Sequence, residues 1–321
     1  MGDFGALLCS QGVRCDICGI LHTALRPAHF PTGPLRTRFA PSPTGHLHLG
    51  HVLHAIYVWG LAQCWDATVL LRLEDHDRQR CKPEYAASIL EDLHWLGFIE
   101  APLQPQQVWR QQDRLPVYAA ALEALVAAGK AYACHCSRAD IVQRTGQQGG
   151  EELRYDGHCR HLGLPMGPDV GIRVTLPNVQ VAFDDAYAGP QSQHPAMQVG
   201  DVLARDRHGN YTYQWAVVLD DLAQEINLII RGEDILSSTG RQICLRQAMG
   251  VTTQPLWVHH PLILGADGQK LSKRDGATGI RALRAQGFTA QQVLGLAAQL
   301  GGLQHTAQPL EVHELPTLLC P

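Results

Sequence analysis

Apolar and polar positions in the first third of the chain switch repeatedly between a strand-like and a helix-like spacing. Short apolar runs alternate with longer segments whose apolar residues recur about every three to four positions. The pattern predicts a strand, a helix, a strand and two helices at residues 35–39, 49–64, 67–73, 83–96 and 113–128. This order is typical of an α/β fold in which a parallel sheet carries helices on both faces.

Between residues 134 and about 200 the regular pattern gives way to cysteines, glycines and short strands such as residues 171–176, which indicates an inserted module. Beyond it we expect two buried strands at residues 211–219 and 226–231 and two helices at residues 280–286 and 289–300, with an irregular C-terminus. The expected segments are a poorly ordered extension at 1–34, two halves of one domain at 35–133 and 206–264, the inserted module at 134–205, and a lysine-containing loop with a short helical tail at 265–321.

Composition narrows the class of protein. Apolar residues make up 45% and charged residues 17% of the 321 positions, as in ordinary globular proteins, and the net charge of −4 gives no global basic field. Any contact with RNA would therefore need a local arginine-rich face. The chain shows neither a spanning apolar run nor the features of a signal peptide, so we expect a cytoplasmic protein without a membrane segment. Its ten unevenly spaced cysteines fit reduced thiols and a metal site better than a disulfide framework.

A turn rich in proline, glycine and histidine joins the first predicted strand to the first predicted helix, at residues 38–51 (R-F-A-P-S-P-T-G-H-L-H-L-G-H). A helix N-terminus attracts anions, Gly50 lets a flat ligand approach the backbone, and His48 and His51 can donate to phosphate oxygens. A metal-binding tract or a solvated polar turn would explain the same spacing. Neither G-x-G-x-x-G nor G-x-x-x-x-G-K-[ST] occurs, which argues against standard dinucleotide or P-loop binding.

Lysine is scarce, and its distribution is uneven. Only four of the 26 basic Lys and Arg residues are lysines, and two of them, Lys270 and Lys273, stand three positions apart in K-L-S-K-R behind the glycine-rich run 265–269. A compact ammonium on a mobile stem differs chemically from a planar guanidinium. The arrangement suits a flexible loop that closes on phosphates, although an isolated pair of this kind is also found in exposed basic turns.

Together these segments resemble a known family. His48-Leu-Gly-His51 resembles the HIGH signature of class I aminoacyl-tRNA synthetases, and Lys270-Leu-Ser-Lys-Arg274 resembles their KMSKS loop. The longer string from Arg38 is similar to that of the glutamyl/glutaminyl subgroup, as are three later segments in the same order, residues 73–80, 213–221 and 230–242. The resemblance covers about residues 35–300. It implies a Rossmann-type parallel sheet with an inserted zinc-containing module and a short helical C-terminal region.

The resemblance also implies an activity and its residues: activation of glutamate by ATP with Mg²⁺, followed by transfer of the glutamyl group to RNA. The implied catalytic residues, which stabilise the triphosphate, are His48, His51, Lys270 and Lys273, and Gly50 and Ser272 join them in binding ATP. The implied glutamate pocket comprises Arg38 and Arg231 for the carboxylates, Glu74 for the ammonium group, and Ser42 and Tyr213 as polar lining. Taken without the resemblance, a strand-end arginine such as Arg38 could simply pair with Glu74 or Asp75.

Cysteine spacing suggests a metal site in the inserted module. Cys134 and Cys136, followed by Tyr155 and Cys159, can supply three thiolates and one oxygen to a tetrahedral ion. On spacing alone His135 or His158 could replace the tyrosine, and three free cysteines beside a core tyrosine are another interpretation. The C-x-C … Y-x-x-x-C pattern resembles the zinc site of glutamyl-queuosine tRNA(Asp) synthetases and so implies one structural Zn²⁺. Cys15 and Cys18, with Cys9 before them, are a weaker signal that also fits an unstructured extension.

The chain ends 48 residues after Lys273, whereas full glutamyl-tRNA synthetases continue into a helical anticodon-binding region. With the cysteine pattern, this implies a glutamyl-queuosine tRNA(Asp) synthetase, which attaches glutamate to the queuosine base in the anticodon. The implied partners are ATP, L-glutamate and the tRNA(Asp) anticodon stem-loop, with no obligate protein partner. The alternatives are a truncated glutamyl-tRNA synthetase that acts on the tRNA 3′ end with a partner chain, and a non-catalytic RNA-binding paralogue. Gly232-Glu-Asp234 and the complete His51 are closer to ordinary glutamyl synthetases.

Overall fold

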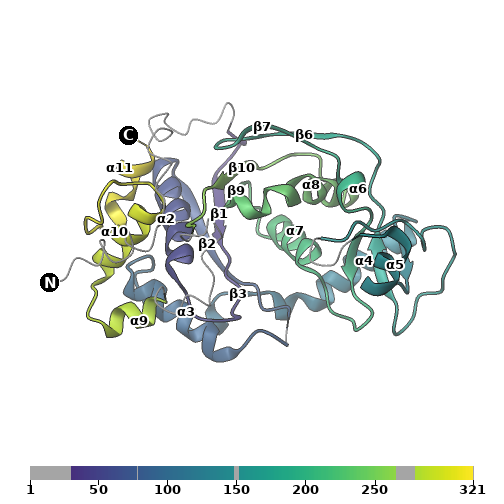
Figure 1. Cartoon of the computed structure of the whole chain (residues 1–321), viewed down its shortest axis with the longest axis horizontal. Helices are drawn as coiled ribbons and strands as arrows, with labels where there is room; N and C mark the ends of the chain where they lie inside the picture. Colours follow the sequence, from purple (N-terminus) through teal and green to yellow (C-terminus); the bar gives the residue numbers. More distant parts are fainter. Residues whose placement is uncertain (1–29, 78, 148–151, 265–278, 321) are drawn as a thin grey trace.

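The computed structural model describes residues 30–77, 79–147, 152–264 and 279–320 (Figure 1). Its first elements follow the predicted order: β1 (Leu35–Phe39), α2 (Leu49–Cys64), β2 (Ala67–Leu73), α3 (Pro83–Trp95) and α4 (Leu115–Ala127). The bounds of β1, α2 and β2 agree with the prediction, because a Pro/Gly turn separates β1 from α2 and Asp66, with a φ of 53°, separates α2 from β2.

Parallel strands form the centre of the fold. Strand β2 lies between β1 and the short β3 (Trp109–Arg110), and β10 (Leu256–His260) lies between β9 (Leu228–Gly232) and β6 (Val181–Asp185). Strand β9 runs beside β1, where the Asn227 backbone N–H donates to the Arg36 carbonyl at 3.2 Å. Strands far apart in the sequence, β1 and β9, therefore lie side by side where the two groups of strands meet.

Helices cover both faces of this sheet (Figure 1). Helix α2 packs against β1, β2 and β9 and is covered in turn by α10 (Ala290–Leu300) and α11 (Leu315–Leu319), with α9 (Ile280–Ala285) nearby. Helices α7 (Tyr213–Ala223) and α8 (Thr239–Ala248) pack against each other on the opposite side. The parallel α/β architecture expected from the sequence is thus present, with one large apolar core around α2 and a second around α7.

The strand expected over residues 211–219 is wrong, because the chain from Tyr213 onward forms helix α7. The apolar run Trp215–Leu219 is buried throughout. A short run that is buried on every side has no period that separates a strand from a helix, and its valines favour a strand when considered alone. Packing against α8 and β8 accompanies the helical form. Strand β10 was not predicted, and the C-terminus, expected to be irregular, contains α11.

The middle of the chain contributes to two sheets. Strands β4 (Ala131–Cys134), β5 (Gly171–Val174) and β8 (Val202–Arg205) form an antiparallel sheet beside helix α5 (Arg138–Thr145). The hairpin of β6 and β7 (Gly189–Gln193) lies between β5 and β8 in sequence, but it joins the sheet of β9 and β10. Figure 1 shows α4 and α5 at the end of the molecule remote from α10 and α11.

A disulfide links Cys64, the last residue of α2, to Cys320, the residue after α11. This departs from the expectation of reduced thiols. The pairing follows from tight packing of α11 on α2, since a Cβ added at Gly60 would lie 2.5 Å from the Leu319 Cδ1 atom. The free cysteines of the described residues are Cys81, Cys134, Cys136, Cys159 and Cys244. Within the same residues, no helix combines the length and apolar character that crossing a membrane requires.

Candidate active site and metal centre

The two predicted histidines lie at the N-terminus of α2. His48 is the N-cap, its Nδ1 accepts from the Gly50 backbone N–H at 3.1 Å, and the Nδ1 of His51 accepts from the His48 N–H at 3.2 Å. Because both Nδ1 atoms accept, each neutral ring carries its proton on Nε2. A Cβ added at Gly50 would lie 2.9 Å from the His48 ring, so a larger residue there would displace this ring from its capping position.

Lys270, Ser272 and Lys273 lie outside the described residues. The chain resumes at Gly279, which forms an antiparallel bridge with His48. The next backbone N–H, that of Ile280, donates to the Leu47 carbonyl at 3.1 Å. The segment that follows the lysines in the sequence is therefore fixed beside the N-terminus of α2.

A cavity of about 350 Å³ opens beside β1 and β9. Four of the five residues predicted to bind glutamate line it together: Arg38, Glu74, Tyr213 and Arg231. Ser42 does not line the cavity, and its side chain is exposed. The other lining residues, which the sequence did not identify, are Ala40, His54 and Ile235.

Ion pairs hold the first half of this cavity. The Arg38 Nε donates to the Asp221 Oδ1 at 3.0 Å, and the Arg72 Nη2 donates to the same oxygen at 2.8 Å and to Glu74 Oε1 at 3.4 Å. All four side chains are buried. Burial favours a higher pKa for Asp221, but the two guanidinium groups outweigh it and the pKa lies below its ordinary value. Arg38 thus pairs with Asp221, and neither Glu74 nor Asp75 is its partner in the structure.

Burial raises the pKa of the Glu74 carboxyl, because Arg72 and Arg38 only partly offset the loss of hydration. Burial likewise raises the pKa of the Tyr213 hydroxyl, which remains a hydrogen-bond donor. The cavity wall therefore holds two guanidinium groups, one carboxyl and one phenol within reach of a small ligand.

Arg231 is fixed by hydrogen bonds at each of its three nitrogens. Its Nε donates to His259 Nε2 at 2.8 Å, its Nη1 to Gln242 Oε1 at 2.6 Å, and its Nη2 to Thr239 Oγ1 at 2.8 Å. His259 Nδ1 lies 2.5 Å from the carboxylate of Asp185. Burial lowers the pKa of His259, which agrees with a neutral ring that accepts from Arg231. These bonds fix the orientation of the Arg231 guanidinium in the cavity wall.

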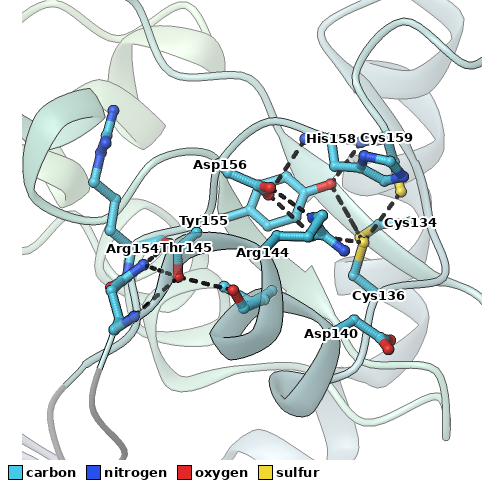
Figure 2. Close-up of polar contacts among 12 residues, drawn as sticks. Cys134, Cys136, Asp140, Arg144, Thr145, Arg154, Tyr155, Asp156, His158 and Cys159 are labelled. Atoms are coloured by element: carbon cyan, nitrogen blue, oxygen red, sulfur yellow. Dashed lines mark hydrogen bonds and ion pairs between the residues drawn. The ribbon is translucent and has the colours of Figure 1, made fainter.

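The predicted metal ligands form a separate cluster at the end of β4 (Figure 2). The thiol sulfurs of Cys134, Cys136 and Cys159 lie within 4.8 Å of one another. The Tyr155 hydroxyl oxygen lies 3.4 Å from the Cys134 sulfur and 3.9 Å from that of Cys136, and the sulfurs of Cys136 and Cys159 are 3.4 Å apart. A tetrahedral zinc ion with bonds of about 2.3 Å needs sulfur separations of roughly 3.7 Å, so the donor set fits such an ion.

The histidines that could have replaced Tyr155 on spacing alone do not join the cluster. His135 and His158 are exposed and contact each other edge to face, with ring centroids 6.2 Å apart. Tyr155 is buried, and its hydroxyl oxygen also accepts from the Cys159 backbone N–H at 2.8 Å. The geometry therefore favours Tyr155 over either histidine as the fourth ligand.

Two arginines donate to the sulfurs. The Arg173 Nε lies 3.3 Å from the Cys134 sulfur, with its guanidinium 3.6 Å above the Tyr155 ring, and Arg144 Nη2 lies 3.3 Å from the Cys136 sulfur. For Cys134, burial opposes the thiolate, but the contacts with Tyr155 and Arg173 lower its pKa. Burial and the neighbouring thiols raise the pKa of Cys136 to about 11, so an ion would have to displace that proton.

A close backbone contact fixes Tyr155 within the cluster. Its backbone N–H donates to the Val199 carbonyl at 2.9 Å, and its own carbonyl oxygen would lie 2.0 Å from a Cβ at Gly200. Gly200 has a φ of 70°, which glycine adopts without strain. A larger residue at position 200 would displace the tyrosine.

Comparison with known proteins identifies the family. Residues 34–313 match the tRNA synthetases class I (E and Q), catalytic domain, and the chain belongs to this family. The glutamyl-Q tRNA(Asp) synthetase of Geobacter sulfurreducens is 41% identical over 257 residues, which cover 79% of this chain and 80% of that protein. Glutamate–tRNA ligase 2 of Acidithiobacillus ferrooxidans is 38% identical over 286 residues, which cover 85% of this chain and 59% of the ligase.

The structure resembles that of a glutamate tRNA ligase from Elizabethkingia meningosepticum in complex with its amino acid, with a TM-score of 0.74 and 26% identity. The similarity covers 90% of this chain and 66% of that protein. The chain spans 56–59% of the length of the glutamate–tRNA ligases that it matches in sequence.

Proposed function

We propose that the protein activates L-glutamate with ATP. The observation that carries this proposal is the cavity of Arg38, Glu74, Tyr213 and Arg231. Two guanidinium groups match the two carboxylates of glutamate, and the Glu74 carboxyl matches its ammonium group. Membership of the class I tRNA synthetases (E and Q) supports the same substrate.

In the proposed reaction, a carboxylate oxygen of glutamate attacks the α-phosphorus of ATP and pyrophosphate leaves. Such a step needs alignment and charge stabilisation more than covalent chemistry. His48 and His51 donate from Nε2 to phosphate oxygens, and Lys270 and Lys273 add positive charge, with Gly50 and Ser272 beside the nucleotide. The bridge between Gly279 and His48 supports an approach of the lysine segment to these histidines. Mg²⁺, bound mainly by phosphates and water, would neutralise charge on the triphosphate.

For the acceptor we favour the queuosine base in the anticodon of tRNA(Asp). Relatives named glutamyl-Q tRNA(Asp) synthetase are 37–41% identical, and the arrangement of Cys134, Cys136, Tyr155 and Cys159 resembles the zinc site of that family. The second candidate is transfer to the 3′ end of tRNA(Glu), since relatives named glutamate–tRNA ligase are 37–38% identical. The cytoplasm, where ATP and tRNA meet, is the compartment that either acceptor requires.

We propose that the cysteine cluster binds one zinc ion with a structural function. Four protein ligands would leave no open position for a substrate. The hydrogen bonds from Arg144 and Arg173 to sulfur would stabilise the thiolates that zinc requires.

Pyrophosphate exchange tests the activation step. With saturating glutamate and ATP we expect glutamate-dependent exchange without added tRNA, and its absence would refute the queuosine acceptor; absence both with and without tRNA would refute the activation of glutamate.

A paired charging assay tests the acceptor. Queuosine-containing tRNA(Asp) should accept labelled glutamate, whereas unmodified tRNA(Asp) and tRNA(Glu) should not. Charging of tRNA(Glu) instead would select the second candidate.

A further inference from the structure

A row of buried polar groups leads from Arg231, which lines the cavity, to a carboxylate that does not line it. The Arg231 Nε donates to the Nε2 of His259, and the Nδ1 of His259 lies 2.5 Å from the Oδ2 of Asp185. Asp185 is the last residue of β6, and His259 and Arg231 lie on β10 and β9, which follow it in the sheet. Neighbouring strands thus carry a carboxylate, an imidazole and a guanidinium in contact with one another.

Both ring nitrogens of His259 face a group whose hydrogen-bonding role is fixed. A guanidinium only donates, so the Nε2 that lies 2.8 Å from the Arg231 Nε is an acceptor and carries no proton. The Nδ1 then carries the proton of the neutral ring and donates it to Asp185. The Oγ1 of Thr239 lies 3.2 Å from the same Nε2, and its hydroxyl can donate there while the oxygen accepts from Arg231. The neighbours of His259 therefore determine its tautomer.

Backbone groups hold the Asp185 carboxylate in place. Its Oδ1 accepts from the backbone N–H groups of Tyr187 at 3.0 Å, Ala188 at 2.8 Å and His259 at 3.3 Å, which leaves Oδ2 for the imidazole. Burial favours a higher pKa for Asp185, but the hydrogen bonds from His259 and the backbone outweigh it, and the pKa lies below its ordinary value. Asp185 is therefore an ionised acceptor with a fixed orientation.

Arg231 differs from Arg38 in how its charge is matched. Arg38 forms an ion pair with Asp221, whereas Arg231 donates to an imidazole, an amide oxygen and a hydroxyl, which are all neutral. Within the described part of the chain Arg231 has no ion pair, so its positive charge is available to an anionic ligand. The neutral imidazole contributes to this only while its Nε2 is free of a proton.

We propose that Asp185 is a positioning residue for glutamate: it fixes the tautomer of His259, and thereby the orientation in which Arg231 binds a carboxylate of the substrate. This inference rests on the proposed activation of glutamate. Asp185 itself adds no group to the cavity, and its effect passes through the imidazole.

Asp185→Asn keeps the shape of the side chain and reverses the bond to His259. The backbone N–H groups require the amide oxygen at the Oδ1 position, so the amide nitrogen donates to Nδ1 and the imidazole proton moves to Nε2. Two donors then face each other between His259 and Arg231. We expect the KM for glutamate in pyrophosphate exchange to rise about ten-fold or more, because hydrogen bonds to charged groups are strong.

Two comparisons show whether this effect is specific. The KM for ATP, which has no carboxylate, should change less than about two-fold in Asp185→Asn. Asp184→Asn is the matched control, since Asp184 precedes Asp185 on β6 and its side chain is exposed. Both KM values of this control should stay within about two-fold of the wild type.

A double-mutant cycle tests whether Asp185 acts through the imidazole. In His259→Gln the amide oxygen can accept from Arg231, and no proton shift can turn that oxygen into a donor. Asp185→Asn should therefore raise the glutamate KM less than about three-fold in this background. The same ten-fold rise in both backgrounds would overturn the proposed route through the tautomer of His259.

The tautomer can also be measured in the wild type, which does not depend on the folding of any variant. Nitrogen-15 NMR of the histidine side chains near neutral pH should show His259 with a proton on Nδ1 and none on Nε2. The His259→Gln spectrum, which lacks this residue, assigns the signals. A proton on Nε2 in the wild type would overturn the inference.

The outcomes separate the two proposals. No glutamate-dependent exchange by the wild type, with or without tRNA, would overturn the proposed function together with this inference. An active wild type whose glutamate KM is unchanged by Asp185→Asn would overturn the inference alone. An equal rise in the KM for ATP would also overturn it, because the substitution would then disturb the site as a whole.

Discussion

The cavity that we propose binds glutamate and the cysteine cluster are both polar sites inside the protein, yet they are assembled in different ways. In the cavity, Arg38 bonds to Asp221 across 183 positions of sequence, and side chains come from β1, α7, β9 and the residue that follows β2. In the cluster, Cys136 and Cys159 are 23 positions apart, and the ligands come from one short segment. The cavity satisfies its charges with ion pairs, whereas the cluster gathers three thiols within 4.8 Å of one another.

This difference predicts different responses to substitution. A cavity maintained by a distributed network should lose activity before it loses its fold, since the surrounding cores remain. The cluster has only a small apolar core of its own, built from Cys134, Ile141, Tyr155 and Cys159, so its structure should depend on the ion.

The largest effect is expected for Cys136→Ser. The zinc content should fall from about one ion per chain to nearly none, and residues 134–147 and 152–159 should lose protection from hydrogen exchange. Structural zinc contributes on the order of 10 kcal/mol in isolated zinc-finger peptides. The glutamate KM should change less than about three-fold if the two sites are independent. Cys81→Ser, at a half-buried free cysteine outside the cluster, is the control and should retain zinc. Unchanged zinc in Cys136→Ser would refute the ligand set.

The next effect concerns the covalent link between α2 and α11. Cys320→Ser should lower the free energy of unfolding by about 2–4 kcal/mol, because the disulfide closes a loop of 256 positions. Urea denaturation of the wild type and the variant, both without reductant, measures this difference. The zinc content of Cys320→Ser should equal that of the wild type. This would show that the packing of α11 on α2 and the cysteine cluster are stabilised separately. Equal stability of the two proteins would mean that the bond contributes nothing in solution.

A smaller loss, this time of catalytic efficiency, is expected when an arginine of the cavity is replaced. Arg231→Lys keeps the charge but cannot reproduce the bonds to Thr239, Gln242 and His259. The kcat/KM for glutamate should fall about 10²-fold, which corresponds to roughly 2.7 kcal/mol. Arg246→Lys changes a buried arginine of α8 that does not line the cavity, so its kcat/KM should stay within about three-fold. Similar losses in both variants would point to a general packing defect.

The smallest effect is a pH dependence of stability. Burial lowers the pKa of His259 below its ordinary value of 6.5, so the unfolded chain binds this proton more readily than the folded one. The contribution of His259 is therefore complete above about pH 6.5 and is lost as the pH falls from there to the lowered pKa of the folded protein, by at most about 1.4 kcal/mol per pH unit. In His259→Gln, whose amide oxygen can accept from Arg231, the difference from the wild type should grow with pH over this range. If the free energies of unfolding of the two proteins change with pH in parallel, the pH dependence comes from other histidines.

Local features of the fold could be predicted from the sequence. Strand β1, helix α2 and strand β2 have clear periods and turn residues between them, so their bounds agreed with the prediction. Helix α7 did not, since its apolar run is buried on all sides. The hairpin of β6 and β7 joins the sheet of β10, a long-range pairing that no local pattern reveals.

In the candidate site, too, local motifs could be predicted from the sequence and long-range contacts could not. Motifs identified Arg38, Glu74, Tyr213 and Arg231, which the structure brings to one cavity. Asp221, the buried partner of Arg38, ends the segment 213–221, and His259, the partner of Arg231, lies outside the segments that carry the resemblance. Which side chains pair depends on the three-dimensional arrangement. The apolar spacing of α2 predicted its core-facing side chains and gave no indication that His54 would line the cavity beside His260.

The disulfide has a practical consequence for handling the protein. The disulfide needs Cys64 and Cys320 in the oxidised state, whereas the proposed metal site needs the thiols of Cys134, Cys136 and Cys159 in the reduced state. A buffer with strong reductant would open the link between α2 and α11, and an oxidising buffer would favour bonds among the clustered sulfurs. Purified samples could therefore differ from one laboratory to the next, and counting free thiols after denaturation would show which form had been studied.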